Sequence, residues 1–251
     1  MHYQLAERFK SIQGEGVYAG TPMAFIRFVG CSVGKTVCSA CDTDFEVPVP
    51  WRGGGTYSAE ELAHGWVKPY SHVCLTGGEP LDQDLTSLLR ELLSPTYSMG
   101  DEPMVHIETS GTINVAKWLA DALGENPQRR RRLWICVSPK PGWLEQSIAE
   151  ADEVKVIMPG LGVFKNGAMQ PAKQFASAST EGGPLILSGG LPWPTLQDAL
   201  RWAANGKTVF LQPRNGRNDL DMANLRLCQD IIVEHPQLRL SVQLHKILKV
   251  Q

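Results

Sequence analysis

The chain has 251 residues, of which 43% are hydrophobic and 20% are charged, and 24 basic residues nearly balance 26 acidic ones. This composition excludes a disordered chain, because it supplies enough apolar side chains for a sizeable core. A formal net charge of -2 argues against nucleic acid as the main partner. No run approaches the roughly 20 apolar residues that cross a bilayer, and Met1–Gln4 lacks a signal-peptide pattern. We therefore expect a cytoplasmic protein that binds neither nucleic acid nor a membrane.

Short apolar runs rich in β-branched residues alternate with amphipathic helical patterns along the chain. The predicted strands are Met23–Phe28, His72–Leu75, Met104–Ile107, Leu133–Val137, Glu153–Ile157, Leu185–Leu187, Thr208–Leu211 and Leu238–Leu244. The predicted helices are Ala59–Val67, Asp84–Leu93, Asn114–Leu123, Leu144–Ala151, Thr195–Ala204 and Asp219–Glu234. This alternation predicts an α/β protein with a parallel sheet, curled or closed, and right-handed crossovers.

Three stretches lack both patterns and are expected to be loops, namely Pro48–Thr56, Ser94–Pro103 and Gly160–Gly183. A fourth, Phe9–Gly16, is expected to be a polar turn ahead of the strand at Met23–Phe28. The sequence shows no internal repeat and no convincing linker. We therefore expect residues 1–251 to form a single domain.

Three of the six cysteines, Cys31, Cys38 and Cys41, fall within eleven residues directly after the strand predicted at Met23–Phe28. Three thiolates on a short loop can hold three irons of a 4Fe-4S cluster and leave the fourth iron open for chemistry. A tetrahedral zinc site is one alternative, although it needs a fourth ligand and no second Cys or His pair lies at close spacing. Unligated or disulfide-bonded thiols are another. The remaining cysteines lie in apolar patterns and are expected in the core: Cys74, Cys136 and Cys228.

Polar or glycine-rich segments directly follow several predicted strands. These segments are Thr76–Pro80, Glu108–Thr112, Ser138–Lys140 and Gln212–Arg214. Enzymes with parallel sheets build their sites at the carboxyl ends of the strands, and the cysteine loop leaves its strand at that same end. A hydrogen-bonded loop is the alternative for any one segment. Together with the cysteine loop they predict one shared pocket.

Two further groups of polar residues suit ligand binding. Gln13 and Glu15 can read the amide and amine edges of a heterocycle, although a capping or hairpin role is the alternative for the glycines beside them. Asp42, Thr43 and Asp44 follow the last cysteine of the loop and offer the hard oxygen ligands that Mg²⁺ takes.

A three-cysteine loop that ends in Cys-x-x-Cys, with Gly-Gly-Glu-Pro after the next strand, resembles the radical S-adenosylmethionine superfamily. The spacing here is C-x6-C-x2-C instead of the commoner C-x3-C-x2-C, and one subfamily tolerates variable spacing at this point. The whole chain resembles that subfamily, the 7-carboxy-7-deazaguanine synthases of the pathway to queuosine and other 7-deazapurines. The segments that carry the resemblance are Phe9–Gly16, Arg27–Cys31, Cys41–Phe45, Thr76–Pro80, Glu108–Thr112, Ser138–Lys140 and Gln243–Lys246.

The resemblance implies an incomplete, open (β/α) barrel of about six core strands, with a metal cluster at the mouth formed by the carboxyl ends of the strands. Cys31, Cys38 and Cys41 would hold the 4Fe-4S cluster, and Thr43 would bind Mg²⁺. The residues implied to bind S-adenosylmethionine are Ala40, Cys41, Asp42, Gly77, Gly78, Glu79, Gly111, Ser138, Pro139, Lys140, Gln212, Pro213, Arg214 and Asn215. Among these, Gly77, Gly78 and Glu79 would meet the methionyl ammonium group.

The implied substrate is 6-carboxy-5,6,7,8-tetrahydropterin, whose ring contracts to give 7-carboxy-7-deazaguanine and ammonia without net oxidation or reduction, so that the enzyme is a lyase. The residues implied to bind it are Ile12, Gln13, Gly14, Glu15, Arg27, Thr109, His245 and the terminal carboxylate at Gln251. Of these, the implied catalytic residues are Gln13, Glu15, Arg27 and His245. Arg27 suits the substrate carboxylate because a guanidinium group is a planar, permanently charged fork.

The resemblance also implies a homodimer and a reducing electron donor such as flavodoxin. Two other functions remain open from the residues alone. An activase for a glycyl radical enzyme would present a surface for a protein partner in place of the pterin-reading residues Gln13, Glu15, Arg27 and His245. A zinc-binding structural module would have no catalytic activity.

Overall fold

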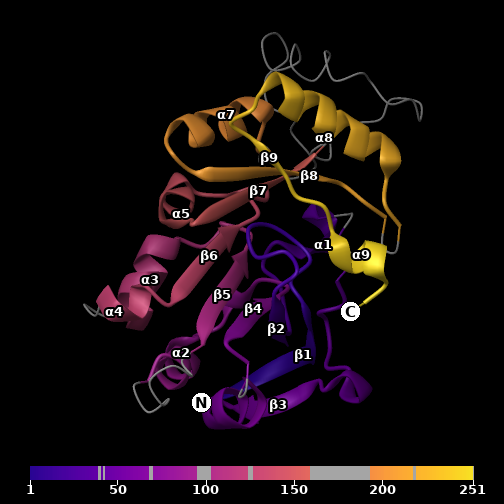
Figure 1. Cartoon of the computed structure of the whole chain (residues 1–251). Helices are drawn as coiled ribbons and strands as arrows, with labels where there is room; N and C mark the ends of the chain where they lie inside the picture. Colours follow the sequence, from indigo (N-terminus) through magenta and orange to yellow (C-terminus); the bar gives the residue numbers. More distant parts are fainter. Residues whose placement is uncertain are drawn as a thin grey trace.

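The computed structural model describes residues 1–38, 41, 43–67, 70–94, 103–123, 127–158, 193–216 and 219–250 (Figure 1). Strands from these residues form one open, nine-stranded sheet with the order β3-β1-β2-β4-β5-β6-β7-β8-β9. The strands are β1 (His2–Ile12), β2 (Pro22–Phe28), β3 (Gly55–Ser58), β4 (His72–Gly77), β5 (Met104–Thr109), β6 (Leu133–Val137), β7 (Glu153–Met158), β8 (Thr208–Pro213) and β9 (Arg239–Leu240).

All neighbouring strands from β2 to β9 are parallel, which confirms the predicted parallel sheet. Because each connection between parallel strands crosses back over the sheet, the carboxyl ends of these strands lie along one edge. The six longer parallel strands, β2 and β4 to β8, correspond to the expected core of an open barrel.

The sequence patterns predict neither β1 nor β3. β1 pairs antiparallel with both β2 and β3, and its register with β2 continues to the pair Ile12 and Pro22. The polar turn expected at Phe9–Gly16 is therefore wrong for Phe9–Ile12, which belong to β1. This half of β1 is only partly buried, so polar residues such as Lys10 and Ser11 are tolerated there and hide the strand pattern.

The α-helices are α1 (Gly34–Val37), α2 (Thr86–Leu92), α3 (Val115–Leu123), α4 (Pro127–Arg130), α5 (Glu145–Glu150), α7 (Leu196–Ala204), α8 (Met222–Glu234) and α9 (Leu244–Leu248). Helices α2, α3, α5, α7 and α8 cover one side of the sheet in the order of the chain (Figure 1), whereas α1 and α9 contain no buried residue. The apolar faces of these five helices pack on the strands in a cluster that includes Leu88, Leu119 and Trp202, and each such side chain stabilises the fold by about 1.5–3 kcal/mol. In the described part of the chain, no helix combines the length and apolar character that crossing a membrane requires.

Several predicted elements need correction. The helix expected at Ala59–Val67 is present, but it has π geometry over η2 (Glu61–Val67). The loop expected at Pro48–Thr56 contains the 3-10 helix η1 (Pro50–Arg52) and the start of β3. Of the strand expected at Leu238–Leu244, only Arg239–Leu240 form a strand, β9, and Leu244 is the first residue of α9. The predictions that lie outside the described residues are the strand Leu185–Leu187, the loop Gly160–Gly183 and most of the loop Ser94–Pro103.

Aromatic and histidine side chains fill the inner face of the sheet near the amino ends of its strands. Tyr18, from the turn after β1, packs edge-on against His106 and Trp134, with ring centroids 4.6 and 5.0 Å apart. His106 Nε2 lies 2.9 Å from Nδ1 of His72. Since this packing closes one end of the curved sheet, access to its interior is from the carboxyl ends of the strands.

Candidate active site

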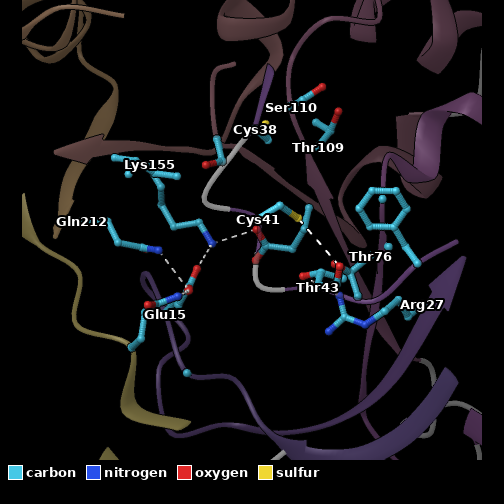
Figure 2. Close-up of a pocket in the computed structure, with 18 of the residues that line it drawn as sticks. Glu15, Arg27, Cys38, Cys41, Thr43, Thr76, Thr109, Ser110, Lys155 and Gln212 are labelled. Carbon is cyan, nitrogen blue, oxygen red and sulfur yellow. Dashed lines mark hydrogen bonds and ion pairs between the residues drawn. The ribbon is translucent and has the colours of Figure 1, made fainter. Parts of the chain in front are cut away.

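A cavity of about 340 Å³ opens at the carboxyl ends of the parallel strands (Figure 2). Its wall combines the turn between β1 and β2, the cysteine loop, residues of β7, the ends of β4, β5, β6 and β8, and α9. The sequence-predicted site residues on this wall are Ile12, Gln13, Gly14, Glu15, Arg27, Cys31, Cys38, Cys41, Thr43, Gly77, Gly78, Thr109, Ser138, Lys140, Gln212, Pro213, Arg214, Asn215 and His245. The fold therefore gathers into one cavity residues that are widely separated in the sequence.

Some predicted residues lie elsewhere. Three that the structure describes are not on the cavity wall, and these are Glu79, Gly111 and Pro139. Gly111 has a φ of +74°, and a Cβ atom there would lie 2.7 Å from Cγ1 of Val137, so the residue shapes the turn after β5. Three further predicted residues lie outside the described part of the chain, namely Ala40, Asp42 and Gln251.

The three-cysteine loop starts directly after β2. The short helix α1 separates Cys31 from Cys38, and the amide of Cys41 donates a hydrogen bond of 2.8 Å to the carbonyl of Cys38. All three thiols are free, partly exposed and on the cavity wall. By contrast Cys74, Cys136 and Cys228 are buried, as the sequence predicts.

Burial raises the pKa of the Cys38 thiol to about 11 against the opposing effect of the Lys140 ammonium group, and burial also raises the pKa of Cys31. A thiol has to lose its proton to bind a metal, so a positively charged metal cluster would offset this burial and release protons on binding. Three clustered thiols beside an open cavity fit a 4Fe-4S cluster with three protein ligands, as sequence analysis predicts.

Two glycines let the end of β4 approach the cysteine loop. A Cβ atom on Gly78 would lie 2.0 Å from the carbonyl oxygen of Gly30 and 2.5 Å from Cβ of Cys31. Gly77 has a φ of +153°, and a Cβ atom there would lie 2.8 Å from the backbone of Phe28. Only glycine fits at these positions, and the backbone of both residues faces the cavity beside the thiols.

Glu79 is completely buried and its carboxylate is occupied by protein donors. Oε1 accepts hydrogen bonds from the Thr109 hydroxyl at 2.7 Å and the Leu81 amide at 3.1 Å, while Oε2 accepts from the amide and hydroxyl of Ser110. Burial raises the pKa of Glu79, and these hydrogen bonds oppose the rise. The side chain therefore ties the end of β5 to the segment after β4, and Thr109 is turned toward Glu79.

Arg27 at the end of β2 is held by Glu7 on β1. The Nε group of Arg27 donates to Oε1 of Glu7 at 2.7 Å, and Nη1 lies 3.5 Å from the hydroxyl of Thr43. The ion pair is mostly buried, since the Arg27 and Glu7 side chains are 18% and 9% exposed. Because Glu7 engages Nε, the two terminal nitrogens remain at the cavity beside Thr43 (Figure 2).

Glu15 lies at the centre of a hydrogen-bond network. Its Oε2 accepts from the Lys155 ammonium group at 2.6 Å, and its Oε1 accepts from Gln212 at 3.0 Å and Gln243 at 2.7 Å (Figure 2). Burial by itself would raise the pKa of Glu15, but the charge and hydrogen bond of Lys155, together with the hydrogen bond of Gln243, hold it at about 2. Glu15 is therefore a carboxylate at neutral pH.

His245 reaches the cavity from α9, close to the turn between β1 and β2. The amide of Leu244 donates to the carbonyl of Gly14 at 2.9 Å, and a Cβ atom on Gly14 would lie 2.1 Å from Nδ1 of His245. The absence of a side chain at residue 14 thus lets the histidine ring sit against the turn that carries Gln13 and Glu15.

Comparison with known proteins bears on this arrangement. No protein-family model matches the chain. Over 265 residues, and with 100% of both chains covered, it is 30% identical to the 7-carboxy-7-deazaguanine synthases of Bradyrhizobium diazoefficiens and Bordetella pertussis. The chain belongs to the 7-carboxy-7-deazaguanine synthase family. The crystal structure of QueE from Escherichia coli aligns with a TM-score of 0.59 at 25% identity, and covers 98% of this chain and 95% of that one. The open, parallel fold is thereby confirmed as that of this radical S-adenosylmethionine family.

For a member of the synthase family, sequence reasoning missed Lys155 as a cavity residue, and it gave no individual role to Thr76, Glu108 and Gln243, although Thr76 and Glu108 lie in segments expected to border the pocket. One signal was available: Lys155 puts a charge into an otherwise apolar strand pattern. No comparable signal separates Thr76 from Thr109, because both end apolar strands. The structure leaves Thr76 at the cavity near Arg27 and Thr43, whereas the Thr109 hydroxyl is engaged by Glu79 (Figure 2).

Proposed function

We propose that the protein converts 6-carboxy-5,6,7,8-tetrahydropterin to 7-carboxy-7-deazaguanine and ammonia. The observation that carries this proposal is that the three-cysteine loop and the turn bearing Gln13 and Glu15 border the same cavity. One wall offers thiol ligands for a cluster, and the other offers hydrogen-bonding groups for a heterocycle and a guanidinium group for its carboxylate. Membership of the synthase family supports the same reaction.

Cys31, Cys38 and Cys41 would hold the 4Fe-4S cluster, with S-adenosylmethionine bound beside it. When bound, these groups would supply the radical that takes a hydrogen atom from the pterin. The exposed backbone of Gly77 and Gly78 lies where the methionyl ammonium group would bind, and Glu79 would support that backbone from behind. We assign the remaining contacts to Ser138, Lys140 and the segment Gln212–Asn215, which line the same wall.

The pterin has a donor edge and a carboxylate, and the cavity offers a complement to each. Glu15 and Glu108 supply carboxylate oxygens for the amine and N–H groups of the heterocycle, with Gln13 and His245 beside them. Arg27 would bind the carboxylate through its terminal nitrogens. Holding both ends fixes the carbon from which hydrogen is taken, and orientation of this kind accounts for much of the rate of such reactions.

The reaction needs no oxidant or reductant, because the product and ammonia together contain all the atoms of the substrate, and the nitrogen that leaves comes from the substrate ring.

The cavity wall contains Phe9, Phe25 and Phe45 as well as the polar groups. These rings would limit the access of water to a reactive radical once substrate fills the cavity.

Anaerobic turnover tests the proposal. The iron-reconstituted, reduced protein would be incubated with S-adenosylmethionine, Mg²⁺ and 6-carboxytetrahydropterin, and the products followed by mass spectrometry. We expect 7-carboxy-7-deazaguanine without stoichiometric loss of S-adenosylmethionine. If 5′-deoxyadenosine accumulates and no deazaguanine forms, the substrate assignment fails, and an activase for a glycyl radical enzyme becomes the better description.

The cluster ligands are tested separately by Cys38→Ala. We expect this variant to remain folded and to lose the visible absorbance of a reconstituted cluster together with all turnover, because only two thiols of the loop remain. Cys228→Ala is the matched control, since Cys228 is a buried thiol of α8 in the helix-side core. Normal turnover by Cys38→Ala would contradict the ligand set.

We further propose that Mg²⁺ binds at Thr43 and bridges to the carboxylate end of the substrate. The Thr43 hydroxyl lies beside Arg27, so a substrate carboxylate bound by Arg27 would be within reach of an ion at Thr43 and would offset its repulsion by the guanidinium group. Mg²⁺ needs few protein ligands and keeps several waters. A rise in the substrate KM on removal of Mg²⁺, without loss of cluster absorbance, is the expected result.

The remaining proposals concern the setting of the enzyme. The six free cysteines support a reducing, cytoplasmic compartment, and the single continuous sheet supports one domain. The family resemblance alone supports a homodimer, a terminal carboxylate contact at Gln251 and an electron donor such as flavodoxin.

A further inference from the structure

Lys155 on β7 places a buried positive charge between two carboxylates of the cavity wall. Its side chain is only 3% exposed. Its ammonium nitrogen lies 2.6 Å from Oε2 of Glu15 and 2.8 Å from Oε2 of Glu108 (Figure 2). The two carboxylates come from the turn after β1 and from β5, and one nitrogen joins both of them to β7.

The other ends of these carboxylates are held by amides. Gln13 donates to Oε1 of Glu108 at 3.2 Å, while Gln212 and Gln243 donate to Oε1 of Glu15. Each carboxylate therefore has one oxygen fixed by an amide and the other by Lys155. The carboxylates themselves stay 16% and 18% exposed, for Glu15 and Glu108, so both remain accessible from the cavity.

We propose that Lys155 is a positioning residue for substrate recognition, which holds Glu15 and Glu108 aligned as paired acceptors for the donor edge of the heterocycle. The inference rests on the proposed function, because it is that reaction whose substrate presents an amine and a ring N–H. Lys155 acts through the two carboxylates. Two carboxylates brought together in a buried site without a cation would share a proton, and a protonated carboxyl group loses acceptor capacity.

Other charged or titratable groups face this network from each neighbouring element. Glu153 lies on β7 itself, and Cys136 of β6, Glu153 and Glu108 have ligand atoms within 4.8 Å of one another. Lys140 after β6, Cys74 of β4 and His245 of α9 interact electrostatically with members of the network. Burial alone would lower the pKa of Lys155. The charges of its acidic neighbours outweigh burial and raise this pKa well above the ordinary value, so Lys155 stays charged at neutral pH; these neighbours are Cys136, Glu108, Glu15 and Glu153.

The test uses Lys155→Met, which keeps most of the side-chain volume and removes the charge. The anaerobic holoenzyme would be titrated with 6-carboxytetrahydropterin at pH 6, 7.5 and 9 by calorimetry, without a reductant that permits turnover. We expect binding at pH 6 to weaken more than tenfold and to recover as the pH rises, because the shared proton is then lost. The unmodified protein should vary much less with pH over this range than Lys155→Met. Lys155→Arg, which restores a cation, should restore the profile of the unmodified protein.

Two comparisons make the result specific. Binding of S-adenosylmethionine should change less than twofold in Lys155→Met, and Lys117→Met, at an exposed position of α3, should bind substrate normally. Pterin binding to Lys155→Met that is as tight as normal, or weaker by the same factor at every pH, would overturn the proposal. An equal loss of S-adenosylmethionine binding would also overturn it, because the effect would then be a general disturbance of the cavity.

A second variant tests the proposal if Lys155→Met does not fold. Lys155→Met with Glu108→Gln removes the like-charge pair, so it should fold and bind the pterin weakly, and its binding should recover less at high pH than that of Lys155→Met, because only the burial of Glu15 then raises a carboxyl pKa. Binding as tight as that of the unmodified protein, or a recovery as large as that of Lys155→Met, would contradict the proposal. Failure of the proposed function is recognised independently, since the unmodified holoenzyme would then neither bind nor convert the pterin.

Discussion

Arg27 shows how a functional side chain depends on one partner in the next strand. The guanidinium group alone suits a carboxylate, but a long side chain has many rotamers and loses entropy when it is fixed. The cross-strand pair of Glu7 and Arg27 fixes it in advance, because the β1–β2 register puts the two residues opposite each other. Arg52 adds a second, longer contact to Glu7 at 3.5 Å.

Replacing Glu7 by glutamine tests this arrangement. Glu7→Gln keeps the shape but substitutes a neutral acceptor, and a neutral hydrogen bond is about half as strong as a charge-assisted one. We expect the substrate KM to rise about tenfold, equivalent to about 1.4 kcal/mol, with little change in the affinity for S-adenosylmethionine. Glu60→Gln, at an exposed position, is the control. A normal KM in Glu7→Gln would mean that Arg27 is aligned without Glu7.

At the scale of elements, α9 is too short to be stable as an isolated helix and depends on tertiary contacts. It is anchored by the hydrogen bond from Leu244 to Gly14 and by a bond from the Lys246 ammonium group to the carbonyl of Gly216 at 2.7 Å. The helix ends at Leu248, and the next residue, Lys249, caps it with a φ of +54°, which is unusual for a residue with a side chain. Its position, and so that of His245, is set by the turn between β1 and β2.

Gly14→Ala is expected to separate function from stability. The new Cβ atom would collide with the His245 ring and displace it, and a side-chain ring can move without unfolding the protein. We expect a rise of about tenfold in the substrate KM, about 1.4 kcal/mol, and a melting temperature within about 4 °C of normal. The matched control is Gly65→Ala, because a Cβ atom there meets no atom within 4 Å. Equal kinetics in the two variants would rule out a role for the Gly14–His245 contact.

At the scale of the whole molecule, the closed end of the curved sheet contains buried groups that must stay neutral. Burial, and to a smaller extent the charge of His72, lowers the pKa of His106 to about 3. In the unfolded chain this histidine has a pKa near its ordinary value of 6.5. Between these values the unfolded chain binds the extra proton, so the free energy of unfolding falls as the pH falls below 6.5.

This linkage predicts acid sensitivity of the fold. Between pH 6.5 and pH 5, the His106 site should cost the native protein about 1.6 kcal/mol of its free energy of unfolding. His106→Gln keeps a polar partner for His72 and removes the titrating group, so urea unfolding of the cluster-free protein should show a shallower pH dependence. The control is His2→Gln, at an exposed position, which should follow the unmodified protein. A parallel pH profile for His106→Gln would disprove the linkage.

Much of the fold could be read from the sequence because the parallel strands are buried on both faces and appear as apolar, β-branched runs. The same reasoning missed β1, whose carboxyl-terminal half is only partly buried and carries polar residues. It also extended β9 into α9, since a short apolar run does not distinguish a strand from a helix. The cysteine loop and the glycines after β4 were predicted because their chemistry depends on local spacing.

The sequence by itself determined the family resemblance, the spacing of the three cysteines proposed as cluster ligands and the strand end that they follow, since each depends on short-range order along the chain. Only the tertiary structure decided which side chains contact one another. In it Thr109 donates a hydrogen bond to Glu79, Thr76 lies at the cavity, and Lys155 forms ion pairs with Glu15 and Glu108. Such pairings connect residues that are far apart in sequence and depend on strand register and side-chain direction, so local patterns carry no record of them.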